Sequence, residues 1–512
     1  MHAISRLANI MNERQQLLAG SPYASTALLS QVRAPRPWGV FASVGPNFRH
    51  AIFGRDSIEV AEDVYLYDQQ LAHDIIITLA RLQGTKNDQQ TEEEPGKVHH
   101  EYRTTHFADQ PVPEQSIGIM RKLQTMWGDP QDGTMLYYGT YDATPLYIRL
   151  VQKYCAVYGG SILHSTYTDK EGVERTIRHS LHIATKWLVD KLLQRQDHLL
   201  AYRRSNPRGI ENQVWKDSRT AYIFSDGTLP NHDRQIVSTE LQGYVYDALL
   251  YAAQIFADKA NTYTQLAGQV QQATLQKLWM PHAQFFAQGL GTDQTGQERQ
   301  IDTLASNGAL LLDSALLQDV SSQTNAKYVS GIEKTIMSPD FLTPAGLRCR
   351  ALRHAKLLAY TDYHGSYAVW PKETLDIARG LLSFGRTASA VALYKSIMHS
   401  FRIAKEFYEL FYVDANNKVY YDQAQALAHF SSTTTGQPLP VPEPGQAWSI
   451  SAAIASSHAL AGALAKKFPR QHSIQQALAL PNPLRPATLT PTFNQLLVSA
   501  QAVLQRRSRQ HK

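Results

Sequence analysis

Cysteine is nearly absent from this sequence of 512 residues, which contains only Cys155 and Cys349. Two cysteines cannot build a disulfide framework, and such low usage is typical of a reducing compartment. Their separation gives no metal-ligand spacing, so two buried thiols are the simpler interpretation. The sequence therefore predicts a fold that depends on its core rather than on cross-links.

Long apolar runs are also missing. A membrane-spanning helix needs roughly 20 consecutive apolar residues, and this chain has no such run. The first residues, Met1–Arg6, form neither the apolar segment nor the small-residue cleavage site of a secretory signal peptide. We therefore expect a cytoplasmic protein without a membrane partner.

A strong excess of one charge is absent as well. The formal net charge is only +6, and part of it lies in the basic segment 506–512, which suits a solvated terminus better than a binding surface. Elsewhere no basic patch with interleaved aromatic residues occurs, so no nucleic-acid partner is expected. What the sequence has instead is 26 tyrosines and 7 tryptophans, amphipathic side chains that suit both a core and a bound sugar.

Helical periodicity dominates the chain, and strand alternation is scarce. Apolar residues recur at helical spacing through 181–192 and 375–382, and Gly385 is placed to end the second of these helices. Thr239 and Gln242 have the spacing of a capping box at the start of a further helix. Additional helical patterns cover 68–83, 144–158, 262–278, 387–404 and 449–466.

The connections between these helices are long and rich in Gly, Asp, Tyr and Trp. Long loops inside a compact domain are usually functional. Many helices with polar and aromatic motifs in their connections predict an all-α toroid, with two concentric helical layers and a pocket at one end. No linker splits the chain, so we expect an N-terminal helical arm at 1–45, a catalytic domain at 46–470, and a helical, basic tail at 471–512.

Acidic residues stand among aromatic, basic and glycine neighbours in three short stretches. These are Phe53-Gly54-Arg55-Asp56-Ser57, Trp215-Lys216-Asp217-Ser218 and Tyr408-Glu409-Leu410-Phe411. A carboxylate on a solvated helix face needs no such neighbours, whereas one that grips a sugar or protonates a glycosidic oxygen does. Glycoside hydrolysis uses two carboxyl groups, one as acid and one as base.

Further motifs extend this series in a familiar order. They are Glu93–Lys97, His100–Arg103, Tyr138–Pro145, Gln242–Tyr246, Ser306–Gly308, Gly346–Arg348, Tyr363–Ser366, Val369–Pro371 and Gln446–Ser449. The whole series resembles the amylo-α-1,6-glucosidase domain of glycogen debranching enzymes and, more loosely, the glucoamylases, over residues from about 45 to about 465. The resemblance implies an (α/α)6 toroid and inverting hydrolysis of α-glucosidic bonds, without a metal or other cofactor.

In this resemblance Asp217 matches the general acid. The acid must be protonated at the working pH, and burial against Trp215 or a neighbouring carboxylate would raise its pKa. An ordinary loop or helix-cap aspartate is the alternative interpretation.

Glu409 matches the general base of the glucoamylase-like enzymes. An inverting base holds a water on the far face of the sugar, about 6.5–9.5 Å from the acid. The debranching pattern instead has a glutamate directly before the tryptophan that matches Trp370, where this chain has Val369. The spacing of the His-Gly-Ser stretch before it differs too, and both departures favour Glu409. Glu373 is the alternative base, although the helix dipole alone explains an acid in a first helical turn.

The expected sugar clamp consists of Arg55 and Asp56, since a fixed Arg–Asp pair forms directional hydrogen bonds with adjacent hydroxyls. A structural ion pair is the alternative, and Glu101 with Arg103 has the same two interpretations. The histidines at 99–100 point to opposite sides of an extended loop, so no metal site is expected. The other expected substrate-binding residues are Tyr138, Asp142, Trp215, Lys216, Gln242, Arg348, His364, Trp370 and Trp448. For the aromatic members, core packing is an equal alternative.

The expected substrate is an oligosaccharide or short glucan. Only about 45 residues precede the first motif, and the chain lacks the glucanotransferase domain of eukaryotic debranching enzymes. The simplest activity is amylo-α-1,6-glucosidase on limit dextrins or isomalto-oligosaccharides. A neutral invertase or a mannosylglycerate hydrolase-like enzyme is the enzymatic alternative. A catalytically inactive glycan-binding module is the non-enzymatic one, and the presence of both Asp217 and Glu409 argues against it.

Overall fold

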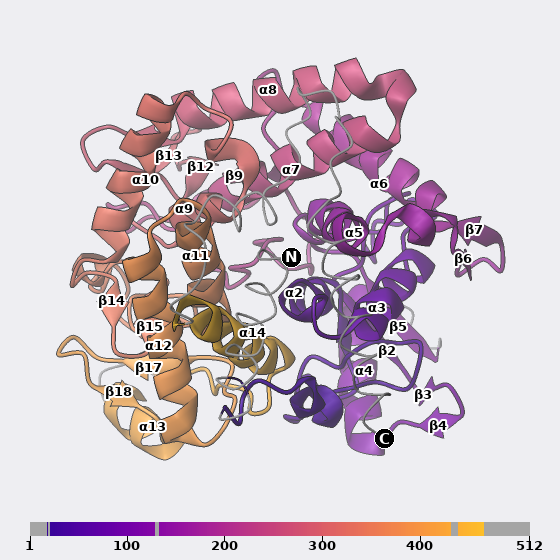
Figure 1. Cartoon of the computed structure of the whole chain (residues 1–512), viewed down its shortest axis with the longest axis horizontal. Helices are drawn as coiled ribbons and strands as arrows, with labels where there is room; N and C mark the ends of the chain where they lie inside the picture. Colours follow the sequence, from indigo (N-terminus) through magenta and orange to yellow (C-terminus); the bar gives the residue numbers. More distant parts are fainter. Residues whose placement is uncertain (1–17, 19–20, 129–132, 432–438, 465–512) are drawn as a thin grey trace, which may run out of the picture.

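The computed structural model describes residue 18 and residues 21–128, 133–431 and 439–464. Two concentric layers of helices surround a central axis (Figure 1). Within these ranges the inner helices contact one another in sequence, and the last returns to the first, so the ring closes. They are α2 (Gly54–Val64), α5 (Ala143–Tyr158), α7 (Thr239–Ile255), α9 (Asn307–Leu310) continued by η4 (Leu311–Asp313), α11 (Pro371–Ser383) and α14 (Ala447–Leu464).

The first five inner segments are each followed in the chain by an outer helix that packs against them. The outer helices are α3 (Gln69–Arg81), α6 (Ile177–Leu192), α8 (Ala260–Lys277), α10 (Ser322–Ile336) and α12 (Thr387–Ala404). The 3-10 helix η1 (Thr26–Gln31) lies against α14. This alternation of inner and outer helices confirms the expected (α/α)6 toroid.

Burial explains which helices lie inside. Every residue of α2 is buried, and α14 is rich in alanine and serine, which let neighbouring helices approach closely. In the outer helix α8, by contrast, the buried residues recur at helical spacing on one face, because the other face meets solvent. These buried residues are Tyr263, Leu266, Ala267, Val270, Ala273 and Thr274.

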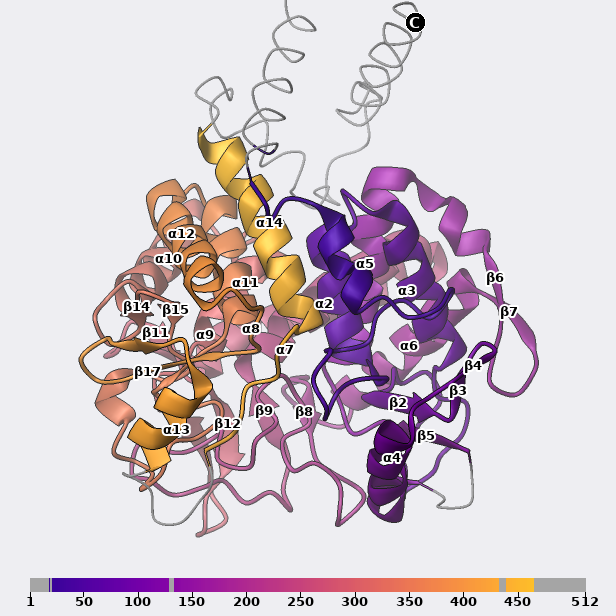
Figure 2. The same ribbon diagram turned by 90° about the horizontal axis from the view of Figure 1, so that it is seen from below.

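Short antiparallel strands lead into the inner helices. β1 (Ile52–Phe53), β9 (Ile236–Ser238) and β16 (Ala368–Val369) come directly before α2, α7 and the N-cap of α11. They belong to the sheets β1-β2-β5, β13-β12-β9-β8 and β16-β17-β18. Their partners are β2 (Glu101–Thr104), β5 (Thr134–Tyr137), β8 (Ala201–Tyr202), β12 (Gly289–Thr292), β13 (Glu298–Ile301), β17 (Phe411–Val413) and β18 (Val419–Tyr420). Figure 2 shows β2, β5, β9 and β12 together at one end of the barrel, away from the end of α14.

Smaller elements complete the connections. Two-stranded hairpins are formed by β3 (His106–Phe107) with β4 (Gln110–Pro111), β6 (Thr166–Thr168) with β7 (Glu174–Thr176), β10 (Trp279–Met280) with β11 (Phe285–Phe286), and β14 (Leu342–Thr343) with β15 (Gly346–Leu347). The remaining helical pieces are α4 (Glu114–Trp127), α13 (Gln423–Ser431), η2 (Gly160–His164), η3 (Ala257–Lys259), η5 (Ala315–Leu317) and η6 (Leu352–His354).

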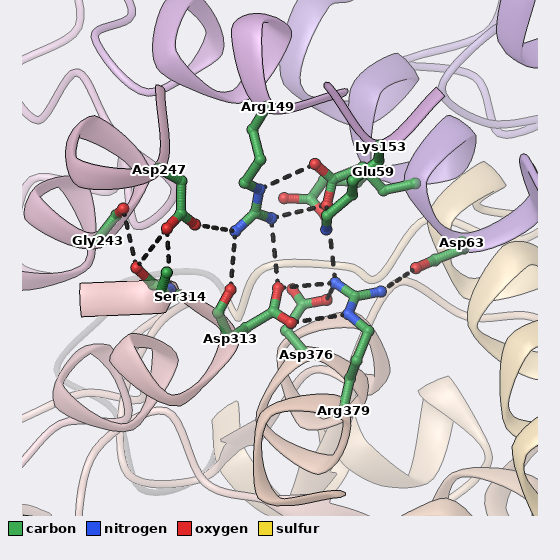
Figure 3. A network of polar contacts seen from close by, with 12 residues as sticks. Glu59, Asp63, Arg149, Lys153, Gly243, Asp247, Asp313, Ser314, Asp376 and Arg379 are labelled. Carbon is green, nitrogen blue, oxygen red and sulfur yellow. Dashed lines mark hydrogen bonds and ion pairs between the residues drawn. The ribbon is translucent and has the colours of Figure 1, made fainter. Parts of the chain in front are cut away.

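A network of charged residues, most of them buried, lies among the inner helices (Figure 3). Ion pairs within it join α2, α5, η4 and α11. In the described part of the chain it contains six carboxylates and four cations, so two negative charges are in excess when all groups are ionised. The members are Glu59, Glu62, Asp63, Asp247, Asp313, Asp376, Arg149, Lys153, Lys372 and Arg379. We name this set the axial network.

The expected capping box is wrong. α7 begins at Thr239, and the N-cap residue Ser238 forms no side-chain capping bond. The Thr239 hydroxyl instead donates to the Ala287 carbonyl at 2.6 Å. The Gln242 amide donates to the Leu200 carbonyl at 2.9 Å and to that of Ser238 at 2.8 Å. Contacts with neighbouring segments therefore occupy both side chains.

The other helix predictions agree with the structure. The helices predicted over 68–83, 144–158, 262–278, 387–404 and 449–466 correspond to α3, α5, α8, α12 and α14, within two residues at each end. Gly385 has a φ of 74° just past α11, as a helix stop requires. The sequence did not predict α4, α13 or the many short strands. Of the expected N-terminal arm at 1–45, the structure describes only the part that contains η1, and the expected tail at 471–512 lies outside the described residues. In the described ranges, every helix is too short or too polar to span a bilayer.

Candidate active site

The expected site residues gather at the N-terminal ends of the inner helices. Arg55 and Asp56 lie in the first turn of α2, Asp142 precedes α5, and Trp448 lies in the first turn of α14. The positive end of a helix dipole favours nearby carboxylates. The end of the barrel that carries the sheets therefore concentrates carboxyl groups.

Arg55 links α2 to two other segments. Its Nε lies 3.1 Å from Asp142 Oδ2, and its Nη1 donates to the Val214 carbonyl at 3.0 Å. Asp142 also accepts a 2.6 Å hydrogen bond from the Thr140 hydroxyl and is fully buried. Asp142 therefore orients Arg55 and does not meet the expectation that it binds substrate directly.

Asp217 lies on an irregular loop and is only half-buried, unlike Trp215 and Lys216 before it. Burial raises the pKa of the Asp217 carboxyl to about 6, Arg55 opposes this, and Asp142 adds to it. This agrees with the expectation that its surroundings favour the protonated form.

Asp56 is a second carboxyl group beside Arg55. Burial raises its pKa to about 7, against the opposing effect of Arg55, and the Asp217 charge contributes further. The Gln446 amide donates to Asp56 Oδ1 at 3.2 Å. Asp56 therefore lies beside Arg55 and the expected acid, while Arg55 itself pairs with Asp142, and the sugar clamp stays a prediction.

Glu409 is buried in the loop before β17. Its backbone N–H donates to the Glu443 carbonyl at 2.9 Å, and the Glu443 N–H lies 3.4 Å from its Oε2. Burial raises the pKa of Glu409 to about 8, while the hydroxyl of Tyr363 donates a hydrogen bond that opposes the shift. The charge of Asp56 also raises the pKa, which places Glu409 near the Asp56 side of the site.

Tyr363 lies near both the expected acid and the expected base. Burial raises its pKa well above the ordinary value, and the charges of Glu409 and Asp217 both add to the shift. Its ring contacts those of His364 and Trp370 edge-on, each with centroids 4.9 Å apart. The sequence marked this tyrosine as part of a motif, and its hydrogen bond to Glu409 could not be read from spacing.

Four aromatic rings pack against one another beside Asp217. Trp215 meets Trp370, Trp448 and His364 edge-on, at centroid distances of 4.9, 5.4 and 5.5 Å. His364 stacks on Trp370 at 5.1 Å. All four are buried. They build the wall behind the acid, so packing rather than sugar stacking accounts for most of their surface.

His364 also fastens the loop that carries the acid. Its Nδ1 lies 2.9 Å from the Ser218 hydroxyl, directly after Asp217. Burial holds the pKa of His364 well below its ordinary value, and Lys216 adds to this, so the ring is neutral. One ring nitrogen is therefore used within the protein, and a sugar hydrogen bond from the other stays a prediction.

Several residues expected to bind substrate are fully buried, and protein groups bind them. Tyr138 donates to the Leu82 carbonyl at 2.9 Å, and Gln242 is bound as described above. Arg348 donates to the carbonyls of Ser366, Val413 and Asp414 at 2.7–2.9 Å. These three side chains brace the connections of the barrel, which corrects the expectation for them.

Lys216 is likewise a structural residue. Its ammonium donates to the Ser306 hydroxyl at 2.6 Å and to the Cys349 carbonyl at 2.9 Å, and lies 3.1 Å from Glu373 Oε1. Three donors therefore meet three acceptors, and the side chain is fully buried. Its expected role in substrate binding is corrected accordingly.

Glu101 and Arg103 form a buried ion pair, and Arg103 Nη2 donates to the Asn47 carbonyl at 2.6 Å. Asn47 in turn donates to Glu443 Oε1 at 2.6 Å, next to Glu409. The structural interpretation of this pair holds, and the pair supports the loop beside the expected base. No sequence pattern pointed to Glu443, which lies in a proline-rich loop.

No known protein family and no curated protein sequence matches this chain. The structure is similar to that of a GH63 mannosylglycerate hydrolase from Thermus thermophilus in complex with glucose, with a TM-score of 0.50 at 14% identity, over 85% of this chain and 99% of that one. It is also similar to a structure described as a wild-type glycosidase, with a TM-score of 0.51 at 11% identity, over 90% and 98% of the two chains. At such identities the similarity establishes a shared fold.

Proposed function

We propose that this protein is an inverting glycoside hydrolase that releases glucose from α-glucosidic linkages, with amylo-α-1,6-glucosidase the simplest activity. One observation carries the proposal: two carboxyl groups with raised pKa values, those of Asp217 and Glu409, both lie close enough to Tyr363 to shift its pKa. Inverting hydrolysis needs such a pair, one carboxyl group to protonate the leaving oxygen and one to activate water. The fold shared with glycosidases supports this function.

In the proposed mechanism, Asp217 protonates the glycosidic oxygen and Glu409 removes a proton from the attacking water. Asp56, which accepts a hydrogen bond from Gln446, binds sugar hydroxyls. Glu409 is buried, and burial raises its pKa, which makes its carboxylate a stronger base. The resemblance to the debranching glucosidases assigns the acid, and the looser resemblance to the glucoamylases assigns the base.

The order of the two pKa values gives the opposite assignment of acid and base. Because the pKa of Glu409, about 8, lies above that of Asp217, about 6, a single proton shared by the pair resides mainly on Glu409. The roles can be separated by leaving-group chemistry. Fluoride needs little protonation, so loss of the acid should spare the hydrolysis of α-glucosyl fluoride, whereas loss of the base should not.

The decisive variants are therefore Asp217→Asn and Glu409→Gln, assayed on isomaltose and on α-glucosyl fluoride. We expect Asp217→Asn to lose about 10³-fold on isomaltose and much less on the fluoride. Glu409→Gln should lose about as much activity on α-glucosyl fluoride as on isomaltose. Azide should restore turnover of this variant and yield β-glucosyl azide. The reverse pattern would exchange the two roles.

Substrate and stereochemistry can be read together by proton NMR with isomaltose, panose, maltotriose, a limit dextrin, sucrose and mannosylglycerate. β-Glucose appearing first from a 1,6-linked substrate supports the proposal. Turnover of sucrose or mannosylglycerate alone would replace it with one of the alternative hydrolases. Sugar binding without turnover of any substrate would indicate a glycan-binding module.

A further inference from the structure

The loop that carries Asp217 has no regular secondary structure, yet it is fastened on both sides of the carboxyl group. Before Asp217, Arg55 donates to the Val214 carbonyl at 3.0 Å. After it, Arg350 Nη2 donates to the Thr220 carbonyl at 2.8 Å. Because no helix or strand fixes this loop, such contacts determine where the carboxyl group lies.

Glu373, in the first turn of α11, contacts the two residues directly before Asp217. Its Oε1 accepts a hydrogen bond from Trp215 Nε1 at 3.2 Å and lies 3.1 Å from Lys216 Nζ. Its Oε2 accepts a 3.4 Å contact from the thiol of Cys349. Both oxygens are thus occupied by protein groups, and the side chain is 1% exposed. The helix dipole explains an acid in this turn, but it does not explain these partners.

We propose that Glu373 is a positioning residue for the acid, and that its buried ion pair with Lys216 holds Asp217 in the reactive geometry. The inference rests on the proposed function and deepens it. Removing one member of a buried ion pair leaves the other charge unpaired in the protein interior. The Glu373–Lys216 pair therefore stays formed. Because Glu373 belongs to the packed helix α11, the pair fixes the loop relative to that helix. Glu373, the alternative base considered from the sequence, is occupied and does not face water.

The test uses the leaving-group comparison again. A displacement of about 1 Å can cost about 10²-fold in rate, and here the displaced group is the one that donates the proton. We therefore expect Glu373→Gln to lower kcat on isomaltose about 100-fold, with KM nearly unchanged and with a loss below about 5-fold on α-glucosyl fluoride. An equal loss on both substrates would overturn the inference, because general damage does not depend on the leaving group.

Two further variants keep the test decisive. Glu373→Gln combined with Lys216→Met removes both buried charges, so a folded protein is expected even if the single variant is unstable, and the same selective loss should appear. Combined with Asp217→Asn, Glu373→Gln should add less than about 2-fold to the loss on isomaltose, since both act through one group. Additive losses would overturn the inference.

Glu240→Gln is the matched control. Glu240 is also a fully buried acid in the first turn of an inner helix, but its partners are Ser238, Tyr222 and Asn307. Any loss in this variant should be equal on the two substrates. A leaving-group effect as large as that of Glu373→Gln would contradict a specific role for Glu373.

A structural readout separates this inference from the proposed function. If the wild-type protein hydrolyses no glucoside, the proposed function fails. Crystal structures of the wild type and of Glu373→Gln with Lys216→Met would still decide the positioning role. Displacement of residues 215–218 with α11 unmoved supports it, and an unchanged loop overturns it.

Discussion

Arg149 of α5 binds Glu62 of the neighbouring inner helix α2 through two hydrogen bonds, Nε to Oε1 at 2.9 Å and Nη2 to Oε2 at 2.7 Å. Lys153 adds a third contact to the same carboxylate at 2.7 Å. Although burial opposes ionisation, Arg149 and Lys153 hold the pKa of Glu62 at about 2. This carboxylate is therefore firmly ionised within the axial network.

Glu62→Gln should therefore destabilise the protein strongly. The substitution leaves Arg149 buried without its bidentate partner, and breaking a buried ion pair typically costs about 3–5 kcal/mol. We expect this loss in the free energy of unfolding throughout pH 5–8, because Glu62 is ionised over that whole range. Chemical denaturation at several pH values measures it, and a change below about 1 kcal/mol would contradict the role given to this pair.

The effect of Asp376→Asn on stability should change with pH, unlike that of Glu62→Gln. Burial raises the pKa of Asp376 to about 7, although Lys372 opposes the shift. An unfolded aspartate ionises near pH 4 (about 3.9), so the stability that its proton contributes is present at low pH and is lost as the pH rises through about 7. The asparagine stays neutral, so the melting temperature of the variant should gain on that of the wild type between pH 5 and pH 8. Calorimetry at both pH values, with Glu62→Gln as the contrasting control, tests this.

Activity should follow a bell-shaped pH profile. The reactive pair holds one proton between the pKa values of Asp217 and Glu409, about 6 and about 8. We therefore expect kcat/KM to rise through about pH 6 and to fall through about pH 8. Initial rates on the best substrate from pH 4.5 to pH 9.5 measure the two limbs. A profile that stays flat up to pH 9.5 would exclude Glu409 from the pair.

Tyr363→Phe should move the alkaline limb to higher pH. The phenol hydroxyl donates to Glu409 and so lowers its pKa, and the variant loses this effect. We expect a kcat about 10-fold lower together with the shifted limb, since a hydrogen bond to a charged group contributes about 1.5–3 kcal/mol. Tyr138→Phe is the matched control, because its hydroxyl donates to the Leu82 carbonyl, and it should leave the pH profile unchanged.

Arg55→Met should move the acidic limb. Arg55 lowers the pKa values of Asp217 and Asp56, so its removal raises both. The lower limb of the profile should shift upward from about pH 6, and kcat/KM should fall by about 10²-fold as the clamp is lost. The pH profile of the variant checks the direction, and a downward shift would contradict the electrostatic role of Arg55.

The sequence determined the fold class and the chemistry-bearing stretches. Helical periodicity located α3, α5, α8, α12 and α14. A helix that packs against its neighbours must place apolar residues at helical spacing along its buried face, and this pattern is visible in the sequence. The short strands escaped prediction, since two to four residues are too few to show an alternating pattern. The motifs around Asp56, Asp217 and Glu409 marked the three carboxyl groups that the structure brings together.

Only the tertiary structure decided which members of those motifs face the site and which support it. In sequence, Lys216 and Asp217 are equal neighbours, yet one is fully buried against Glu373 and the other is half-exposed. The partners that decide this, such as Ser306 and Cys349, lie far away along the chain. A polar side chain becomes structural when distant groups satisfy its donors and acceptors. Spacing along the sequence cannot show which distant groups will meet a side chain, because the closed ring of helices brings those groups together.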